Sequence, residues 1–83
     1  MVEGNKKTLL QMRGNQSGTV VQVEGGRGPV DRLSAMGIRP GKRITKVGSM
    51  AMRGPVTIEV DRVQIAIGFG MAKKITVELD GER

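Results

Sequence analysis

The sequence has no cysteine, histidine, tyrosine or tryptophan, and Phe69 is the only aromatic residue among its 83 residues. Without cysteine, the chain can form neither a disulfide nor a thiolate metal site. Without histidine, it lacks the commonest metal ligand and the commonest general base at neutral pH. We therefore predict a protein that is not an enzyme and that holds no cofactor and no tightly bound transition metal.

Long hydrophobic runs are also missing. The longest, residues 65–72, includes two glycines, whereas a membrane-spanning helix needs about 20 apolar residues. The first seven residues, Met1–Lys7, have no apolar stretch of the kind that a signal peptide carries. We expect a cytoplasmic protein that does not insert into a membrane.

Positive charge is what the sequence has in excess. It contains 14 Lys and Arg against 8 Asp and Glu, which gives a formal net charge of +6. Residues 32–62 hold seven of the basic residues and two of the acidic ones. Such a stretch suits nucleic acid, acidic lipid headgroups or an acidic protein surface, or is simply a solvated face. Nucleic acid is the less favoured partner, because proteins that bind single strands add several aromatic platforms.

Alternating apolar and polar residues predict three strands near the end of the chain, over 56–60, 63–67 and 75–79. Only Asp61 and Arg62 separate the first two of these segments, and a gap of two residues suits a hairpin. This part of the chain is therefore predicted to form antiparallel sheet.

Earlier strands are less regular. Segments 19–24 and 43–47 carry apolar residues at spacings that a flat strand does not explain, so each needs a bulge or a strong bend. A further short strand is expected over 8–12. A second, one-turn helix is expected around 71–74.

One short helix is well marked. Pro29 suits its first turn, and Asp31 is expected near the same end, where the helix dipole favours an anion. Gly37 is predicted to take the left-handed position that ends the helix, with Ile38 packing back on Leu33. A turn follows at once, because proline and glycine come next to each other in its two central positions, at 40 and 41.

These elements predict a mainly β protein, a small SH3-like barrel with one short inserted α-helix. Many short strands joined by turns, with 13 glycines in the chain, are typical of such barrels. We expect one domain over residues 8–80, flanked by polar tails at 1–7 and 81–83.

Two patterns that resemble ligand or catalytic sites have simpler interpretations. Gly25–Gly28 lacks both the third glycine of a dinucleotide fingerprint and the Gly-Lys-Ser/Thr of a P-loop, so we interpret it as a flexible turn. The acidic pairs Glu59 with Asp61 and Glu78 with Asp80 lie on the polar faces of predicted strands. A solvated face is favoured there over an acid–base pair or a hard-metal site.

Six residues are candidates for contact with a protein partner. The three apolar ones lie in predicted loops, where exposed apolar side chains often mark contact surfaces. The three basic ones lie in or beside turns, where they would steer association with an acidic surface. The alternative is that the apolar residues only cap the open ends of the barrel. The six are Arg39, Lys42, Met50, Met52, Arg53 and Phe69.

Short motifs occur in a fixed order along most of the chain, from about residue 9 to residue 78. The most specific is Arg32–Gly41, which contains Arg-Leu followed by Met-Gly-Ile-Arg-Pro-Gly. The others are Gly14, Gly18–Val20, Gly25–Gly26, Gly54–Val56, Ile65–Ile67 and Met71–Ile75. In this order and spacing, the chain resembles the FeoA family, the ferrous iron transport protein A group.

The resemblance implies an SH3-like barrel with a short helix inserted. It also implies a small cytosolic protein that accompanies FeoB, the ferrous iron permease with a GTP-binding cytosolic domain. Members are regarded as accessory proteins that act by protein contact, and no catalytic motif carries over. At the position of Phe69 the family often has a basic residue, so any charge-based contact there is altered in this chain. The alternatives are a small nucleic-acid-binding barrel and an isolated SH3-like domain like those that end some metal-dependent repressors.

Overall fold

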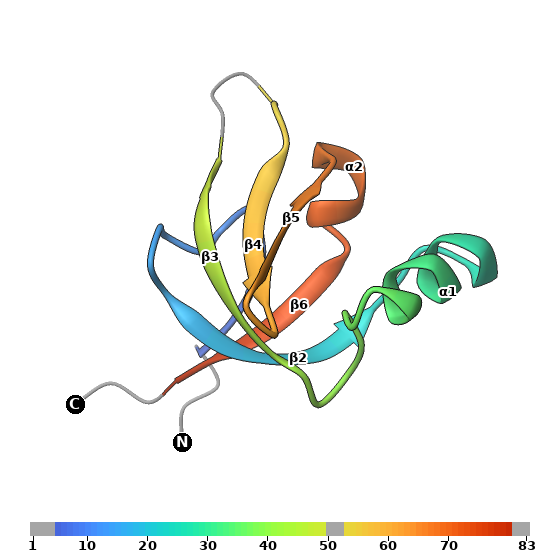
Figure 1. Ribbon diagram of the computed structural model, residues 1–83, viewed down its shortest axis with the longest axis horizontal. Coiled ribbons are helices and arrows are strands. Elements are labelled where there is room, and N and C mark those ends of the chain that lie inside the picture. The colour runs from blue at the N-terminus through green and yellow to red at the C-terminus, as the bar shows by residue number, and fades with distance from the viewer. Residues whose placement is uncertain (1–4, 50–52, 81–83) are drawn as a thin grey trace.

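A single antiparallel sheet curls around the interior of the protein, with two short helices at its margins (Figure 1). The computed structural model describes residues 5–49 and 53–80. Its six strands lie in the order β1-β6-β2-β3-β4-β5. The elements are β1 (Lys6–Thr8), β2 (Ser17–Val23), α1 (Arg27–Ala35), β3 (Arg43–Ser49), β4 (Val56–Val60), β5 (Val63–Ile67), α2 (Phe69–Ala72) and β6 (Ile75–Leu79).

The three strands predicted from alternation are confirmed as β4, β5 and β6. The two irregular strands are also present, each slightly longer than expected or shifted. The register of β2 against β6 shifts between Val20 and Gln22, and the register of β3 against β4 shifts between Lys46 and Gly48. The predicted bulges therefore exist, and they bend the two strands around the core.

The strand expected over residues 8–12 is wrong. The paired strand is β1, and the chain from Thr8 turns sharply, because the backbone N–H groups of Gln11 and Met12 both donate to the Thr8 carbonyl, at 3.0 and 3.1 Å. Leu9 and Met12 are buried, and their spacing of three residues fits a turn better than a strand. Lys6, which the sequence placed in a polar tail, pairs with Glu78 of β6.

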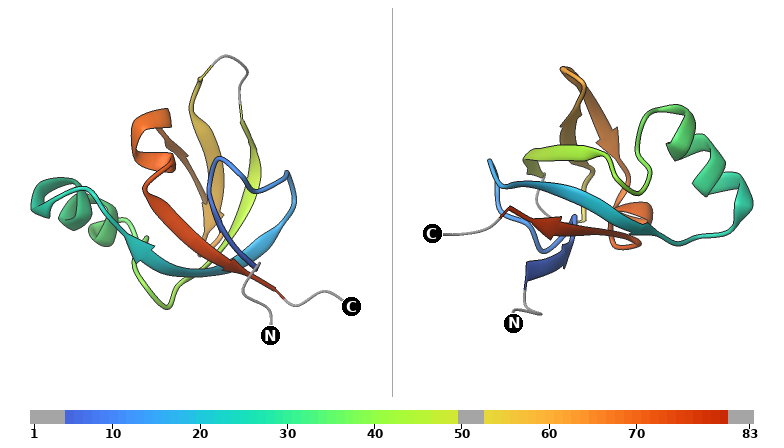
Figure 2. Two further views of the ribbon diagram at one scale, coloured as in Figure 1. Left: turned by 180° about the vertical axis from the view of Figure 1, so that it is seen from behind. Right: turned by 90° about the horizontal axis from the view of Figure 1, so that it is seen from below.

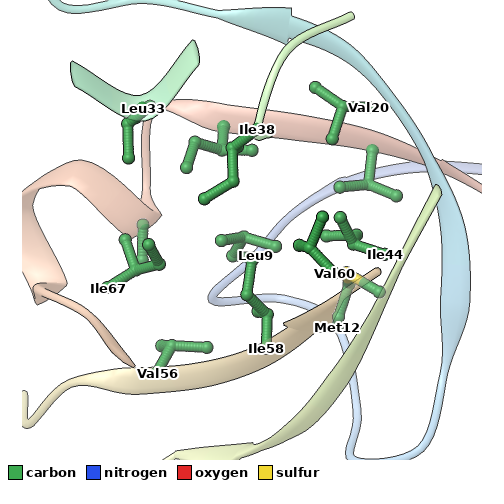
Figure 3. Close-up of a cluster of buried hydrophobic side chains, with 13 residues drawn as sticks. Leu9, Met12, Val20, Leu33, Ile38, Ile44, Val56, Ile58, Val60 and Ile67 are labelled. Atoms are coloured by element: carbon green, nitrogen blue, oxygen red, sulfur yellow. The ribbon is translucent and has the colours of Figure 1, made fainter. Parts of the chain in front are cut away.

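Buried apolar side chains fill one continuous core (Figure 3). They come from strands β2 to β6, from both helices, and from the turns after β1 and after α1. Burying a large aliphatic side chain contributes about 1.5–3 kcal/mol, so this cluster is the main source of stability. Its members are Leu9, Met12, Val20, Leu33, Ile38, Ile44, Val56, Ile58, Val60, Ile67, Ala72, Ile75 and Val77.

Helix α1 lies to one side of the curved sheet in all three views (Figures 1 and 2). It begins at Arg27, so Pro29 falls in its first turn as expected. The expected position of Asp31 is wrong, because no acidic residue lies in the first turn of α1. The helix begins two residues before the proline, and this places Asp31 beyond the turn where the dipole acts most strongly.

The end of α1 is as predicted. Gly37 has φ 92, its N–H donates to the Ser34 carbonyl at 2.9 Å, and the Ile38 N–H donates to the Leu33 carbonyl at 2.9 Å. These two bonds are those of the Schellman motif. Ile38 and Leu33 then both reach the core (Figure 3).

Gly37→Val is expected to lower the free energy of unfolding by about 1–2 kcal/mol, because a β-branched residue is strained at positive φ. A Cβ at this position would also lie 3.4 Å from Val60 Cγ1. Thermal melts should show a fall in Tm of about 5–10 °C. Gly48→Val is the control, because Gly48 has open space around it and no positive φ. Equal melting of Gly37→Val and the parent would contradict this helix end.

Two turns lie next to each other, because Lys42 of the first forms an ion pair with Asp61 of the second. In the first, the Lys42 N–H donates to the Arg39 carbonyl at 3.1 Å with Gly41 at φ 96, as the predicted turn requires. In the second, Asp61 and Arg62 join β4 to β5 with φ values of 52 and 69. The two-residue hairpin is therefore confirmed, and its backbone matches a type I′ turn without glycine.

Candidate protein-interaction site

Phe69 is the first residue of α2, so its predicted place in a loop is wrong. The helix begins directly after β5 and two residues earlier than expected, because the Gly68 carbonyl accepts the N–H groups of Met71 at 3.1 Å and Ala72 at 2.9 Å. Phe69 is half-buried. Phe69 therefore belongs to a turn of helix, α2, that follows the end of β5 (Figure 1).

Two cations lie against the Phe69 ring. Arg53, from the connection between β3 and β4, has its Cζ 5.6 Å from the ring centroid, and Lys73, just after α2, has its Nζ 6.0 Å away. Each such contact contributes about 0.5–1 kcal/mol at an exposed site. We call Arg53, Phe69 and Lys73 the Phe69 cluster. It combines a positive charge with an apolar surface, the pair of properties that an acidic partner with an apolar anchor point would recognise.

Met50 and Met52 lie outside the described residues, so their role remains a prediction. Met52 directly precedes Arg53 in the chain, and Met50 stands three positions before it. Arg53 itself is exposed and has φ 67. The structure thus brings together two of the six predicted residues, Arg53 and Phe69, which are sixteen positions apart in the sequence.

The other two predicted bases share the turn before β3. The Arg39 guanidinium donates to the Ser34 carbonyl at 3.0 Å, across the end of α1. Lys42 Nζ lies 2.9 Å from the carboxylate of Asp61, whose side chain is 65% exposed. An ion pair this open to solvent is weak and leaves both charges able to exchange partners. Asp61 precedes β5 and Phe69 follows it, so the two groups of bases stand at opposite ends of that strand.

Two other bases of the positive stretch are already engaged. Arg43 forms a two-pronged ion pair with Asp80, with both N–O distances 2.8 Å. These hydrogen bonds lower the pKa of the Asp80 carboxyl below its ordinary value. The contact links β3 to the residue after β6. Asp80, one member of a predicted acidic pair, is therefore engaged with a base of β3.

Lys46 is the residue that sequence reasoning missed. Its side chain lies in the core at 4% exposure, and its Nζ donates to the Met12 carbonyl at 2.6 Å and to the Leu10 carbonyl at 3.4 Å. Burial lowers the pKa of this ammonium below its ordinary value of 10.5. A signal was present, because Lys46 stands two residues after Ile44 and alternation places both on the inner face.

The acidic residues form no metal site in the part of the chain that the structure describes. Among residues 5–49 and 53–80, no group of three His, Cys, Asp or Glu side chains is placed to hold an ion. Over the same residues, no helix is long and apolar enough to cross a membrane.

The sheet order and inserted helix define a small SH3-like barrel, and solved structures share it. A crystal structure of an iron uptake regulatory protein, FeoA, superposes with a TM-score of 0.83 at 35% identity and covers 90% of this chain and 99% of that one. A manganese-dependent transcriptional repressor has a TM-score of 0.79 at 20% identity, over 90% of this chain and 42% of its own. At 20% identity, the similarity to the repressor shows a shared fold and nothing about function.

Sequence comparison identifies the family. A family model described as the FeoA domain matches residues 7–79. A protein of Methanocaldococcus jannaschii named Fe(2+) transport protein A is 39% identical over 59 residues, which cover 71% of this chain and 70% of that protein. The chain belongs to the FeoA family, as its motifs and its SH3-like barrel predicted.

Proposed function

We propose that this chain is a cytoplasmic accessory protein of ferrous iron uptake that binds the cytosolic part of a FeoB-type permease. Its membership of the FeoA family supports a role in ferrous iron transport. The observation that carries the contact is the Phe69 cluster, in which two cations flank the only aromatic ring of the chain. The protein acts in this proposal by binding, without catalysis.

The parts of the cluster have different roles in binding. Phe69 is an anchor, because a half-buried aromatic ring held on a helix inserts into a partner pocket with little loss of conformational freedom. Arg53 and Lys73 are exposed, and they steer an acidic surface toward the ring. The aromatic ring itself carries no charge, and its two neighbours supply the positive charge beside it. The net charge of +6 favours the same kind of partner.

Kinetic measurement of two variants against the soluble cytosolic domain of the permease separates these roles. Phe69→Ala is expected to raise the off-rate by about tenfold, because truncation of an anchor acts on dissociation. Arg53→Glu is expected to lower the on-rate several-fold and to reduce its dependence on salt. Arg13→Glu is the control, since it makes the same change of charge at an exposed base in the loop between β1 and β2.

Each outcome bears on a different part of the proposal. If neither variant changes binding while both keep the parent melting temperature, the Phe69 cluster is not the contact surface. If Arg13→Glu slows association as much as Arg53→Glu does, the charge acts only through the net charge of the molecule.

A further inference from the structure

Strand β5 is an open edge of the sheet. It pairs with β4 on one side, and no strand in the described part of the chain pairs with the other. The opposite edge, β1, is only three residues long and carries two lysines, which are common devices against unwanted strand pairing. Strand β5 has none of these devices, because Val63–Ile67 contains no charge, no proline and no glycine.

The geometry of the hairpin determines which backbone groups face outward. Val60 and Val63 bracket a two-residue turn, so they form a hydrogen-bonded pair, and every second pair after them does the same. The N–H and C=O groups of Gln64 and Ala66 therefore point away from β4. No other described backbone group bonds to them. Two donors and two acceptors are available for an added strand.

Apolar side chains border this edge. Val63 is 57% exposed although it pairs with the buried Val60, and Ile65 is only half-buried. Met36, at the end of α1, is 40% exposed. It is next to Gly37, which packs against Val60, since a Cβ there would lie 3.4 Å from Val60 Cγ1. An added strand would therefore cover apolar surface as well as pair with the backbone.

Positive charge stands at both ends of β5. Arg62 precedes the strand directly, and Lys42 lies beside its start, where it offsets the Asp61 carboxylate, so this end carries a net positive charge. The cations of the Phe69 cluster stand at its far end. The strand between these groups is uncharged and spans about 17 Å.

This charge pattern decides whether a second copy of the chain or a segment of another protein pairs with β5. A second copy pairing antiparallel about Ile65 would place Arg62 beside Gly68 of that copy and so near the cations of its Phe69 cluster. Two molecules that each carry a net charge of +6 would repel at both ends of such a pair. A segment with an apolar middle and acidic ends would meet complementary charge at both ends instead.

We infer that β5 accepts an extended segment of a protein partner by strand addition, and that this segment has alternating apolar residues between acidic ends. Backbone bonds to Gln64 and Ala66 supply affinity, and the bases at the two ends of β5 supply selectivity and register. The inference deepens the proposed function, on which it rests for the identity of the partner. It joins two of the predicted bases, Lys42 at one end of β5 and Arg53 at the other, into one linear surface.

The probe is a synthetic peptide of about nine residues, with alternating valine and threonine between two acidic residues at each end. Titrated into the isotope-labelled chain, it should shift the amide signals of Gln64 and Ala66 first. Ala66→Pro, which removes an outward N–H, should weaken binding by about tenfold. Gln64→Ala is the matched control, since it alters a side chain and keeps the N–H.

Changes in the peptide keep the test independent of protein folding. Alternate N–H groups of an extended peptide point to opposite edges. N-methylation of the residues whose N–H groups face β5 should abolish binding. N-methylation of the residues whose N–H groups face away from β5 should leave binding intact. Lysine in place of the acidic ends should also abolish it. Binding that survives methylation on both edges, or signal shifts confined to the Phe69 cluster, would overturn strand addition. Dimerisation of the chain that Ala66→Pro abolishes would assign the edge to a second copy and overturn the inference.

The same variants separate this inference from the proposed function. If the permease domain binds the parent and Ala66→Pro equally, and the peptide does not compete, strand addition is wrong and the permease remains the partner. If the peptide binds at β5 while the permease domain does not bind at all, the edge is a docking strand and the permease is not its partner.

Discussion

The Gly18→Ala variant is expected to melt about 10–20 °C below the parent protein. Gly18 lies in β2, paired with Ile44 of β3 and with Leu79 of β6. A Cβ at this position would lie 2.5 Å from the Glu78 carbonyl oxygen and 2.6 Å from Val77 Cγ1. Because the first of these atoms belongs to the backbone, β6 itself must move to admit even one methyl group.

Overpacking of this kind costs typically about 1–3 kcal/mol, and the backbone contact places Gly18→Ala at the upper end of that range. Gly14→Ala is the control, because a Cβ there would meet only the Val47 carbonyl oxygen, at an ordinary 3.5 Å. Thermal melts followed by circular dichroism compare the two. A Gly18→Ala midpoint within the error of the Gly14→Ala midpoint would show that β2 and β6 are not packed this closely.

Lys46→Met is expected to lower the free energy of unfolding by about 1–3 kcal/mol, because it leaves buried backbone acceptors without a donor. Methionine matches the aliphatic stem of lysine but cannot donate to the carbonyls of Met12 and Leu10. The turn after β1 would lose these two side-chain hydrogen bonds to β3. Lys74→Met, at an exposed lysine, is the control, and urea unfolding measures both. Equal stability of the two variants would contradict a structural role for the Lys46 amine.

The difference in stability between the parent and Lys46→Met should change with pH in a definite direction. The folded-state pKa of Lys46 lies below 10.5, its ordinary value, which it regains on unfolding. The unfolded state therefore binds this proton more tightly, and stability rises with pH through the interval between the two pKa values. The neutral amine still carries two donors for its two carbonyls. The stability advantage of the parent over Lys46→Met should therefore grow as the pH rises toward 10.5. A stability advantage that shrinks with rising pH would contradict this.

Local features of the fold could be predicted from the sequence. Strands β4, β5 and β6 follow from strict alternation, and the end of α1 follows from Gly37 and its neighbours, because each depends on residues only a few positions apart. The bulges in β2 and β3 could be inferred from apolar spacing that a flat strand does not allow.

Features that depend on distant residues could not be predicted. Gly18 must be glycine because β6, sixty positions later in the chain, passes over it. Lys46 is tolerated in the core only because the turn after β1 presents two carbonyls to it. The position of β1 was misjudged for the same reason, since its pairing with β6 joins opposite ends of the chain.

The candidate site was predicted in part. Residue type and local charge selected Arg53 and Phe69, but their contact depends on how the β3–β4 connection meets α2. Arg39 and Lys42, also chosen as candidates, lie in the turn before β3, where Lys42 pairs with Asp61 just before β5. Lys73 belongs to the Met71–Ile75 motif but was not among the candidate contact residues, because only the fold brings it to the Phe69 ring.

Binding of the parent chain to full-length FeoB-type permease from the same organism, reconstituted in lipid nanodiscs, tests the central claim most directly. We predict saturable binding to permease-containing discs, none to empty discs of the same acidic lipid composition, and a loss of affinity in the Phe69→Ala variant. Equal binding to empty discs, or no binding to the permease, would contradict the assignment of this protein as a permease-binding accessory of ferrous iron uptake.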